Sequence, residues 1–179
     1  MDHAIDQGFA FGHGNGTNHH YGYNIRKIYD AMWLMRDKIA ARGKTDEYVK
    51  VLAYWSGLAE TRKPYVYGRD ELLDSWHTLL IPKIVSALML PDEAEQYRAM
   101  KSLGVWLSGS LGFTPGTIGG IKPDGTTFHH GGFYPAYSTG AFAMIGYFCK
   151  ATRGTDFTLS EQARRNFKLA LMTMASYTD

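Results

Sequence analysis

Apolar side chains recur with the period of an α-helix along most of this 179-residue chain, and this pattern limits the possible folds more than any other feature of the sequence. The first such segment carries apolar side chains on one helical face at Ile25, Ile28, Tyr29, Met32 and Ile39. Six segments share the pattern, and they begin near Ile25, Thr45, Asp70, Asp92, Tyr137 and Ser160. No stretch alternates apolar and polar residues as a good β-strand would. The sequence therefore predicts an all-α fold of antiparallel helical hairpins.

Local signals predict where several of these helices begin and end. Gly43 should end the first helix, and Thr45 is placed to cap the second. Pro82 should kink or interrupt the third helix, because proline lacks the backbone N–H that a helix interior needs. Ser160 lies in a capping box, so the last helix should run from there to about Tyr177.

The composition is that of one folded domain, and it excludes several classes of partner. Hydrophobic residues make up 45% of the chain, which is enough to bury a core, and charged residues make up 20%. A net charge of +2 without a basic run argues against nucleic acid, and no apolar run reaches the roughly 18 residues that a membrane span needs. Cys149 is the single cysteine, so no disulfide can form within the chain. The first residues lack a signal-peptide pattern, so we expect a cytoplasmic protein or a removed natural N-terminus.

Two glycine-rich segments, 8–24 and 109–135, interrupt the helical pattern, and both are predicted to be loops. They contain most of the histidines of the chain, at His13, His19, His20, His129 and His130. Long ordered loops inside a compact domain tend to carry function. We therefore look for a site in these two segments.

The second segment pairs His130 with Tyr137, seven residues further on. The glycine pair after His130 and Pro135 allow the chain to bend, so that both side chains can reach one substrate atom. Histidine titrates near neutrality and suits a general base, and a tyrosine phenol suits proton delivery. Hydrolysis of a glycoside normally needs two carboxyl groups beside the bond, whereas this segment offers only Asp124, in a turn. Elimination from a uronate instead needs a base at C5, donors against the carboxylate and an acid at the C4 oxygen.

The sequence also resembles a known family at two separate places. The second segment resembles the catalytic segment of the chondroitin ABC lyases of polysaccharide lyase family eight at Pro123-Asp124-Gly125-Thr126, His130, Gly132, Tyr134-Pro135 and Tyr137. The first segment resembles the histidine-pair segment of that branch at Gln7-Gly8-Phe9 and His19-His20-Tyr21-Gly22-Tyr23. The likeness covers the chain from about Asp6 to Tyr177, and the double match is specific.

The resemblance implies roles for individual residues. His130 would be the base for glucuronate substrates, and Tyr137 the acid, with a second role as base left open. His20, with His19 beside it, would serve the iduronate epimer from the opposite face of the sugar. His77 lies near the position of a polar group that neutralises the carboxylate. The remaining residues expected to bind substrate are His129, Tyr134 and Trp76.

The resemblance also implies the domain to which the chain belongs and the partners of the whole protein. Residues 1–179 would be a fragment of one catalytic domain with an incomplete (α/α) toroid fold, followed in the natural protein by β-domains. The family's catalytic arginine and glutamate lie further along the chain than Asp179. The expected partner is an acidic polysaccharide, namely chondroitin or dermatan sulfate and in some cases hyaluronan. No cofactor is expected to be required, although a peripheral Ca²⁺ or Mg²⁺ would be compatible, and relatives are usually secreted or periplasmic bacterial enzymes.

Other interpretations of these residues stay open. The fragment could be a glycan-binding or scaffold module without activity, or an α/α-barrel glycoside hydrolase with two acids facing one cleft. Trp76 has helical spacing, which is more typical of a core residue than of a sugar platform. A structural zinc site could also use imidazoles of both glycine-rich segments, at His19, His20, His129 and His130.

Overall fold

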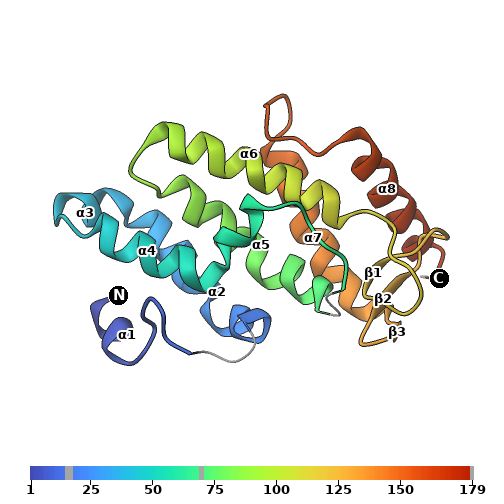
Figure 1. Ribbon diagram of the computed structural model, residues 1–179, viewed down its shortest axis with the longest axis horizontal. Helices are drawn as coiled ribbons and strands as arrows, with labels where there is room; N and C mark the ends of the chain where they lie inside the picture. The colour runs from blue at the N-terminus through green and yellow to red at the C-terminus, as the bar shows by residue number, and fades with distance from the viewer. Residues whose placement is uncertain (15–17, 69–70, 178–179) are drawn as a thin grey trace.

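The computed structural model describes residues 1–14, 18–68 and 71–177, and at Asn18 and His19 it describes the backbone alone. The chain is mostly helical, as predicted. The helices are α1 (Asp2–Asp6), α2 (Asn18–Leu34), α3 (Arg36–Ala41), α4 (Thr45–Ser56), the 3₁₀ helix η1 (Leu58–Arg62), α5 (Leu72–Leu88), α6 (Glu93–Ser110), α7 (Pro135–Ala151) and α8 (Glu161–Ala175). Three short strands are β1 (Gly120–Ile121), β2 (Thr127–His129) and β3 (Gly132–Phe133). In Figure 1, α3 and α4 lie at one end of the molecule, and the strands and α8 lie at the other.

Helix α5 is the centre of the fold. It packs between α2 and α7, while α4 and α6 also contact it and α8 packs on α6 (Figure 1). Tyr23 of α2 contacts Asp74 of α5, and three residues further along both helices Arg26 contacts His77. Contacts that advance together along two helices mean that α2 and α5 run in the same direction.

Helix α7 runs in this direction too. Asp74 of α5 and Tyr137 of α7 both lie against His129, and three residues on in each helix His77 meets Gly140. The first turns of α5 and α7 therefore meet at β2, and the second turn of α2, which carries Tyr23, lies against the first turn of α5.

Helix α2 begins at Asn18 and not at Ile25, so the segment from His19 to Tyr23 is helical although the sequence predicted a loop. Gly22 explains this difference. A Cβ built on Gly22 would lie 2.2 Å from Thr78 Oγ1, which is far inside van der Waals contact. A glycine that suggests a loop in the sequence is therefore the residue that lets α2 approach α5.

Two further local expectations differ from the structure. Pro82 does not interrupt α5, because the helix contains it and continues to Leu88. A proline inside a helix costs about 3 kcal/mol, but each buried aliphatic side chain of α5 gains about 1.5–3 kcal/mol, and the helix is packed along most of its length. Thr45 does not cap α4, whose N-cap is Lys44 with no side-chain cap bond.

The predicted starts of two helices, at Asp92 and Ser160, are confirmed. The carboxylate of Asp92 accepts a hydrogen bond from the Glu95 backbone N–H at the start of α6. The hydroxyl of Ser160 accepts one from the Ala163 N–H at the start of α8. Both contacts satisfy N–H groups that the first helical turn leaves without a partner.

Segment 109–135 contains a small antiparallel sheet in the order β1-β2-β3, where the sequence predicted no strand. Phe128 of β2 pairs with Gly120 on one side and Phe133 on the other. The Lys122 ammonium is buried and donates to the Thr114 hydroxyl at 2.9 Å and to the Ile118 carbonyl at 2.5 Å. These bonds close the loop before β1 and hold β2 in a fixed place.

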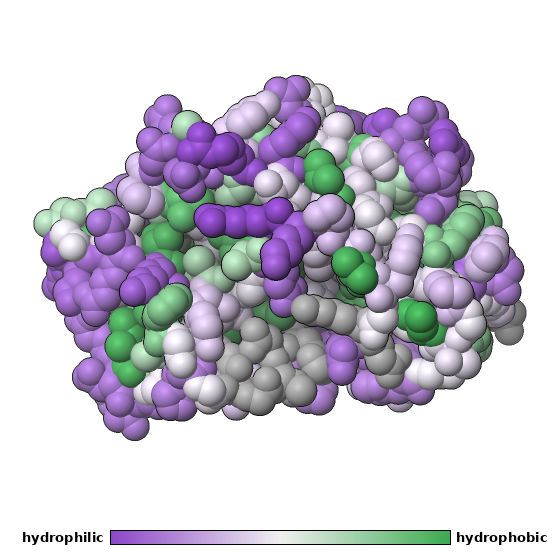
Figure 2. All heavy atoms as spheres, in the orientation of Figure 1, coloured by the Kyte–Doolittle hydropathy of each residue, from purple (hydrophilic) through white to green (hydrophobic). Residues whose placement is uncertain are grey.

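The buried apolar residues form two clusters. The first joins α5, α6, α7 and α8 around Trp76 and Phe148, and the second joins α2, α3, α4 and the end of α5 around Tyr29 and Leu52. On the face in Figure 2, hydrophilic side chains cover most of the surface, and apolar residues appear as separate small areas. Among the helices that the structure describes, none combines the length and apolar character needed to cross a bilayer.

Candidate active site

Two neighbouring histidines lie at the turn between β2 and β3. Neighbouring side chains in an extended strand point to opposite faces. His130, however, has a φ of 50°, and Gly131 follows with a φ of 75°. Two successive left-handed residues make the tight two-residue turn of a hairpin, and here His129 pairs with Gly132 across it. The His130 ring consequently lies beside the His129 ring, with ring centroids 3.9 Å apart.

Two tyrosines at the start of α7 complete a row of rings. The Tyr137 ring centroid is 4.4 Å from that of His129 and 6.3 Å from that of His130. Tyr134, at the N-cap of α7, lies 4.7 Å from Tyr137. Pro135 occupies the first turn of α7, where its missing N–H costs nothing, and so fixes the start of the helix next to the strands. His129 is buried, whereas His130 and Tyr134 are exposed and Tyr137 is half-buried.

A buried carboxylate lies behind this row, and sequence reasoning missed it. Asp74 of α5 is 1% exposed. Its Oδ1 accepts a 2.6 Å hydrogen bond from the Tyr23 hydroxyl, and its Oδ2 lies 3.5 Å from His129 Nε2. Burial, and then the Asp74 carboxylate, raise the pKa of Tyr23 far above its ordinary value, so the phenol keeps its proton. The one available signal was an aspartate inside an apolar helical run, next to Leu73.

His77 lies one turn beyond Asp74. Its ring packs against Gly140 of α7 and meets the edge of the Tyr23 ring at 5.5 Å between centroids. Its Nε2 lies 3.3 Å from Nη1 of Arg26. A guanidinium only donates, so Nε2 accepts and the proton of the neutral ring is on Nδ1. Burial, and next the Arg26 charge, lower the pKa of His77 below its ordinary value, so this ring is neutral at neutral pH.

The predicted histidine pair of the first segment lies on the first turn of α2. His20 is exposed and precedes Tyr23 by three residues, so the two side chains lie on neighbouring turns of one helical face. The hydrogen bond from Tyr23 to Asp74 thus connects the helix that carries His20 to α5, whose Asp74 faces His129 next to His130. The side chain of His19 lies outside the described residues.

Trp76 does not fit its predicted role. Its side chain is fully buried in the first cluster, and its indole N–H donates to the Ser110 hydroxyl at 2.9 Å. A buried ring offers no surface to a sugar, so the prediction of a sugar platform at Trp76 was wrong. His129 is also buried, at 1% exposure, so its position suits support of His130 and Tyr137 better than direct contact with a substrate.

Three of these groups could hold a cation. Ligand atoms of Asp74, His129 and His130 lie within 4.8 Å of one another. Two imidazoles and a carboxylate are ligands that zinc accepts, and the turn at His130 places both rings on one side. Any cation bound here would occupy the lone pair of His130 and remove it as a base.

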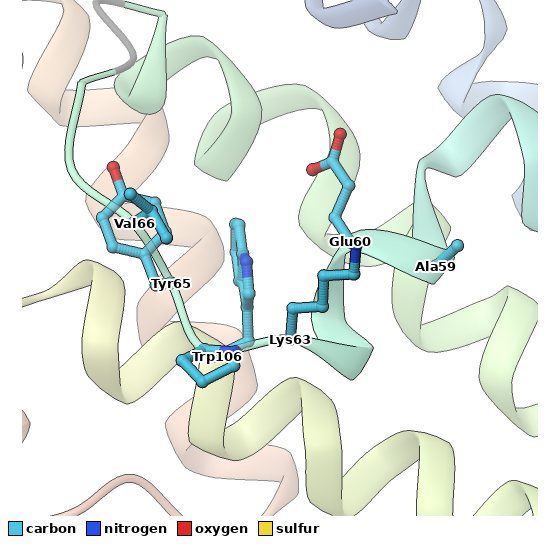
Figure 3. A pocket seen from close by; sticks show the side chains of 7 residues that line it. Ala59, Glu60, Lys63, Tyr65, Val66 and Trp106 are labelled. Atoms are coloured by element: carbon cyan, nitrogen blue, oxygen red, sulfur yellow. The ribbon is translucent and has the colours of Figure 1, made fainter.

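A hollow lies away from the histidines, between η1 and α6. It has a volume of about 400 Å³ and is lined by Ala59, Glu60, Lys63, Pro64, Tyr65, Val66 and Trp106. In Figure 3, Tyr65 and Val66 lie on one side of the Trp106 ring, and Glu60 and Lys63 lie on the other. Among these lining residues Glu60 supplies the one carboxylate, so the hollow does not offer the two flanking acids of a glycoside hydrolase.

The arrangement around His129 places an exposed imidazole and a half-buried phenol against the same buried ring. Such a pair can remove a proton at one atom of a bound molecule and deliver one at another. A helical scaffold that carries such a pair of side chains suits an enzyme domain. The chain belongs to a lyase family, because the family model described as "Lyase, catalytic" matches residues 1–179.

Comparison with curated proteins narrows this class. The chain is 36% identical to a chondroitin sulfate ABC exolyase of Bacteroides thetaiotaomicron, in an alignment that covers 98% of this chain and 17% of that protein. It is 30% identical to a chondroitin sulfate ABC exolyase and to a chondroitin sulfate ABC endolyase of Proteus vulgaris, with 98% and 99% of this chain and 18% of each relative covered. The chain therefore spans less than a fifth of the length of the curated relatives that it matches.

Proposed function

We propose that this chain is part of a polysaccharide lyase that cleaves chondroitin and dermatan sulfate by β-elimination at the uronic acid. The observation that carries the proposal is the placement of His130 and Tyr137, 6.3 Å apart between ring centroids and in contact with the same buried ring. The names of the relatives support the substrate class. Hyaluronan, a related acidic polysaccharide, is a further candidate substrate.

The proposed reaction moves two protons. His130 removes the proton from C5 of the uronate, and the electrons of that C–H bond form the C4–C5 double bond. The bond from C4 to the glycosidic oxygen breaks, and its electrons stay on that oxygen, which takes a proton from Tyr137. The products are a free hydroxyl and an unsaturated uronate.

The carboxylate of the uronate gains charge while the C5 proton leaves, so donors must lie against it. We propose His77 for this role, because its neutral ring carries a proton on Nδ1 and is fixed by Arg26 and Gly140. His20 would act as the base for the iduronate epimer, whose C5 proton lies on the opposite face of the ring. Its place on the first turn of α2, next to Tyr23, is compatible with this role.

The layered helices fit a larger assembly. We propose that α2, α5 and α7 are inner helices, and α4, α6 and α8 outer helices, of an incomplete (α/α) toroid in the whole protein. The common direction of the three inner helices supports this proposal. We further propose that the whole protein is secreted or periplasmic and that its chemistry requires no cofactor, with any Ca²⁺ or Mg²⁺ bound peripherally.

The experiment that tests the function uses the whole protein that contains this chain, supplied with chondroitin sulfate. His130→Ala and Tyr137→Phe should each slow the rise in ultraviolet absorbance of the unsaturated uronate by roughly 10²–10⁴-fold, the usual contribution of one acid–base group. His3→Ala, on the exposed side of α1, is the matched control and should leave the rate unchanged. Full activity in either site variant contradicts the assignment, a saturated product indicates a hydrolase, and binding without turnover indicates a scaffold.

A further inference from the structure

A hollow of about 320 Å³ opens between α2, α5 and α7, next to the histidine site. This volume lies at the lower end of the range of about 300–1,000 Å³ that small-molecule sites occupy. Arg26 and Lys27 of α2 line one side, and Met144 and Tyr147 of α7 line the other. His77 of α5 belongs both to this hollow and to the site described above. A chain of sugars bound at His130 could therefore continue into the hollow.

The charges of the hollow favour an anion. Lys27 already has a partner, because its ammonium lies 3.2 Å from the Asp30 carboxylate and both groups are exposed. Arg26 is half-buried, and no carboxylate in the described part of the chain forms an ion pair with it. Nη1 of its guanidinium lies 3.3 Å from Nε2 of the neutral imidazole of His77. A partly buried guanidinium normally pairs with a carboxylate, sulfate or phosphate, whose oxygens match its donors.

The opposite side of the hollow is suited to a sugar ring. Gly140, Met144 and Tyr147 recur at intervals of four and three residues, so they share one face of α7. Gly140 lies against His77, which turns that face toward α5. Tyr147 is 59% exposed, so its ring presents an apolar face at the rim and a hydroxyl to the solvent.

We propose that this hollow binds the sugar next to the cleaved uronate, with Arg26 holding an anionic group of that sugar and Tyr147 packing against its ring. The inference rests on the proposed function for the identity of the ligand, an acidic glycan. The anionic group is a sulfate or a carboxylate, because both present coplanar oxygen pairs to a guanidinium. Arg26 also fixes His77, so the contact between these two residues links the hollow to the histidine site.

The test measures binding and not turnover, so that it can be read even if the lyase proposal fails. The whole protein, in a Tyr137→Phe background that stops the proposed chemistry, is titrated with a chondroitin 4-sulfate tetrasaccharide and with its unsulfated counterpart. Arg26→Gln should weaken binding of the sulfated sugar by roughly tenfold or more, the usual loss for a charged hydrogen bond. Arg26→Lys should fall between wild type and Arg26→Gln, and Tyr147→Ala should weaken both ligands by about threefold or more.

The two ligands separate the two sources of the anion. Weaker binding of the sulfated sugar alone identifies a sulfate, and equal weakening of both sugars identifies a carboxylate. Arg165→Gln removes the same charge from α8, where Arg165 pairs with Glu161, and should change both affinities by less than about twofold. Affinities within twofold of wild type in Arg26→Gln and Tyr147→Ala would overturn the inference. If Arg26→Gln does not fold, Arg26→Lys and Tyr147→Ala decide it in the same way.

Discussion

The carboxylate of Asp74 contacts two other elements of the molecule at once. From its place on α5, the carboxylate accepts a hydrogen bond from the hydroxyl of Tyr23 on α2, and it faces Nε2 of His129 on β2. His129 in turn is the ring against which His130 and Tyr137 pack. A buried carboxylate that faces an imidazole fixes both the rotation of the ring and the nitrogen that carries the proton. Asp74 therefore positions His130 and Tyr137 through His129 without reaching the substrate itself.

Replacing Asp74 by asparagine tests this positioning role. Asp74→Asn keeps the side-chain volume and an acceptor for Tyr23, but it removes the charge that faces His129. We expect kcat of the whole enzyme to fall by roughly 10–100-fold while KM changes less than about threefold, because small displacements of catalytic groups cost rate more than affinity. Steady-state kinetics on chondroitin sulfate measure both quantities. Ser86→Ala, which removes another buried hydrogen-bonding group of α5, should keep the wild-type kcat. A large rise in KM with unchanged kcat would show that Asp74 acts on binding instead.

Residues that lie close in the sequence were predicted well, and residues that meet only in the fold were not. His130 and Tyr137 are seven positions apart, so their spacing and the glycines between them indicated that they could meet. Asp74 reaches His129 across 55 positions, and no local pattern indicates that contact. Trp76 shows the opposite case. Its position next to His77 in the sequence indicated a contact with substrate, but its side chain is buried in the fold.

At the scale of elements, the approach of α2 to α5 depends on a missing side chain. Gly22 faces Thr78 and Leu79 so closely that a Cβ would lie 2.2 Å from the threonine hydroxyl. The neighbouring turns of α2 carry His20 and Tyr23. Any displacement of α2 therefore moves both residues away from α5.

Two glycine substitutions separate packing from helix propensity. Gly22→Ala should lower the free energy of unfolding by about 1–3 kcal/mol through overpacking, less the gain of up to about 1 kcal/mol that alanine brings to a helix. Gly146→Ala, inside α7 with nothing within 4 Å of its Cβ position, should raise stability by up to about 1 kcal/mol. Urea unfolding followed by circular dichroism measures both changes. If the two variants gain stability alike, the close approach of α2 to α5 is not a constraint.

The bounds of most helices followed from the sequence because caps and apolar period are local signals. Two helices start at Asp92 and Ser160, as predicted, and these two side chains cap them. The strands were missed because they are two or three residues long, too short for alternation to be visible. Pro82 does not interrupt α5 because burial of the helix outweighs the local cost of the proline, and that burial depends on partners distant in sequence.

At the scale of the whole molecule, three helices with a common direction bring distant segments to one place. The second turn of α2 and the first turns of α5 and α7 supply Tyr23, Asp74 and Tyr137, which lie more than 50 positions apart in each case. Such convergence is a property of the layered architecture and is invisible to spacing arguments. The all-helical class was predictable from the apolar period, but the meeting of these three turns required the packing order of the helices.

The two apolar clusters are joined through α5, and Lys83 lies where they meet. Its side chain is 1% exposed, and Nζ donates to the Ser56 carbonyl at the end of α4, next to Trp55 of the second cluster. It also lies 5.7 Å from the ring centroid of Trp106, in the first cluster.

Lys83→Met keeps most of the volume but leaves the Ser56 carbonyl without its charged donor. We expect this to lower the free energy of unfolding by about 1–2 kcal/mol, since the lost bond of about 1.5–3 kcal/mol is partly offset by relief of charge burial. Because α5 contributes to both clusters, tryptophan fluorescence and circular dichroism should report one shared transition that shifts as a unit. Lys168→Met on the exposed side of α8 should shift neither signal by more than about 0.5 kcal/mol. Separate midpoints for the two probes in Lys83→Met would show instead that the clusters unfold independently and that this lysine is the link between them.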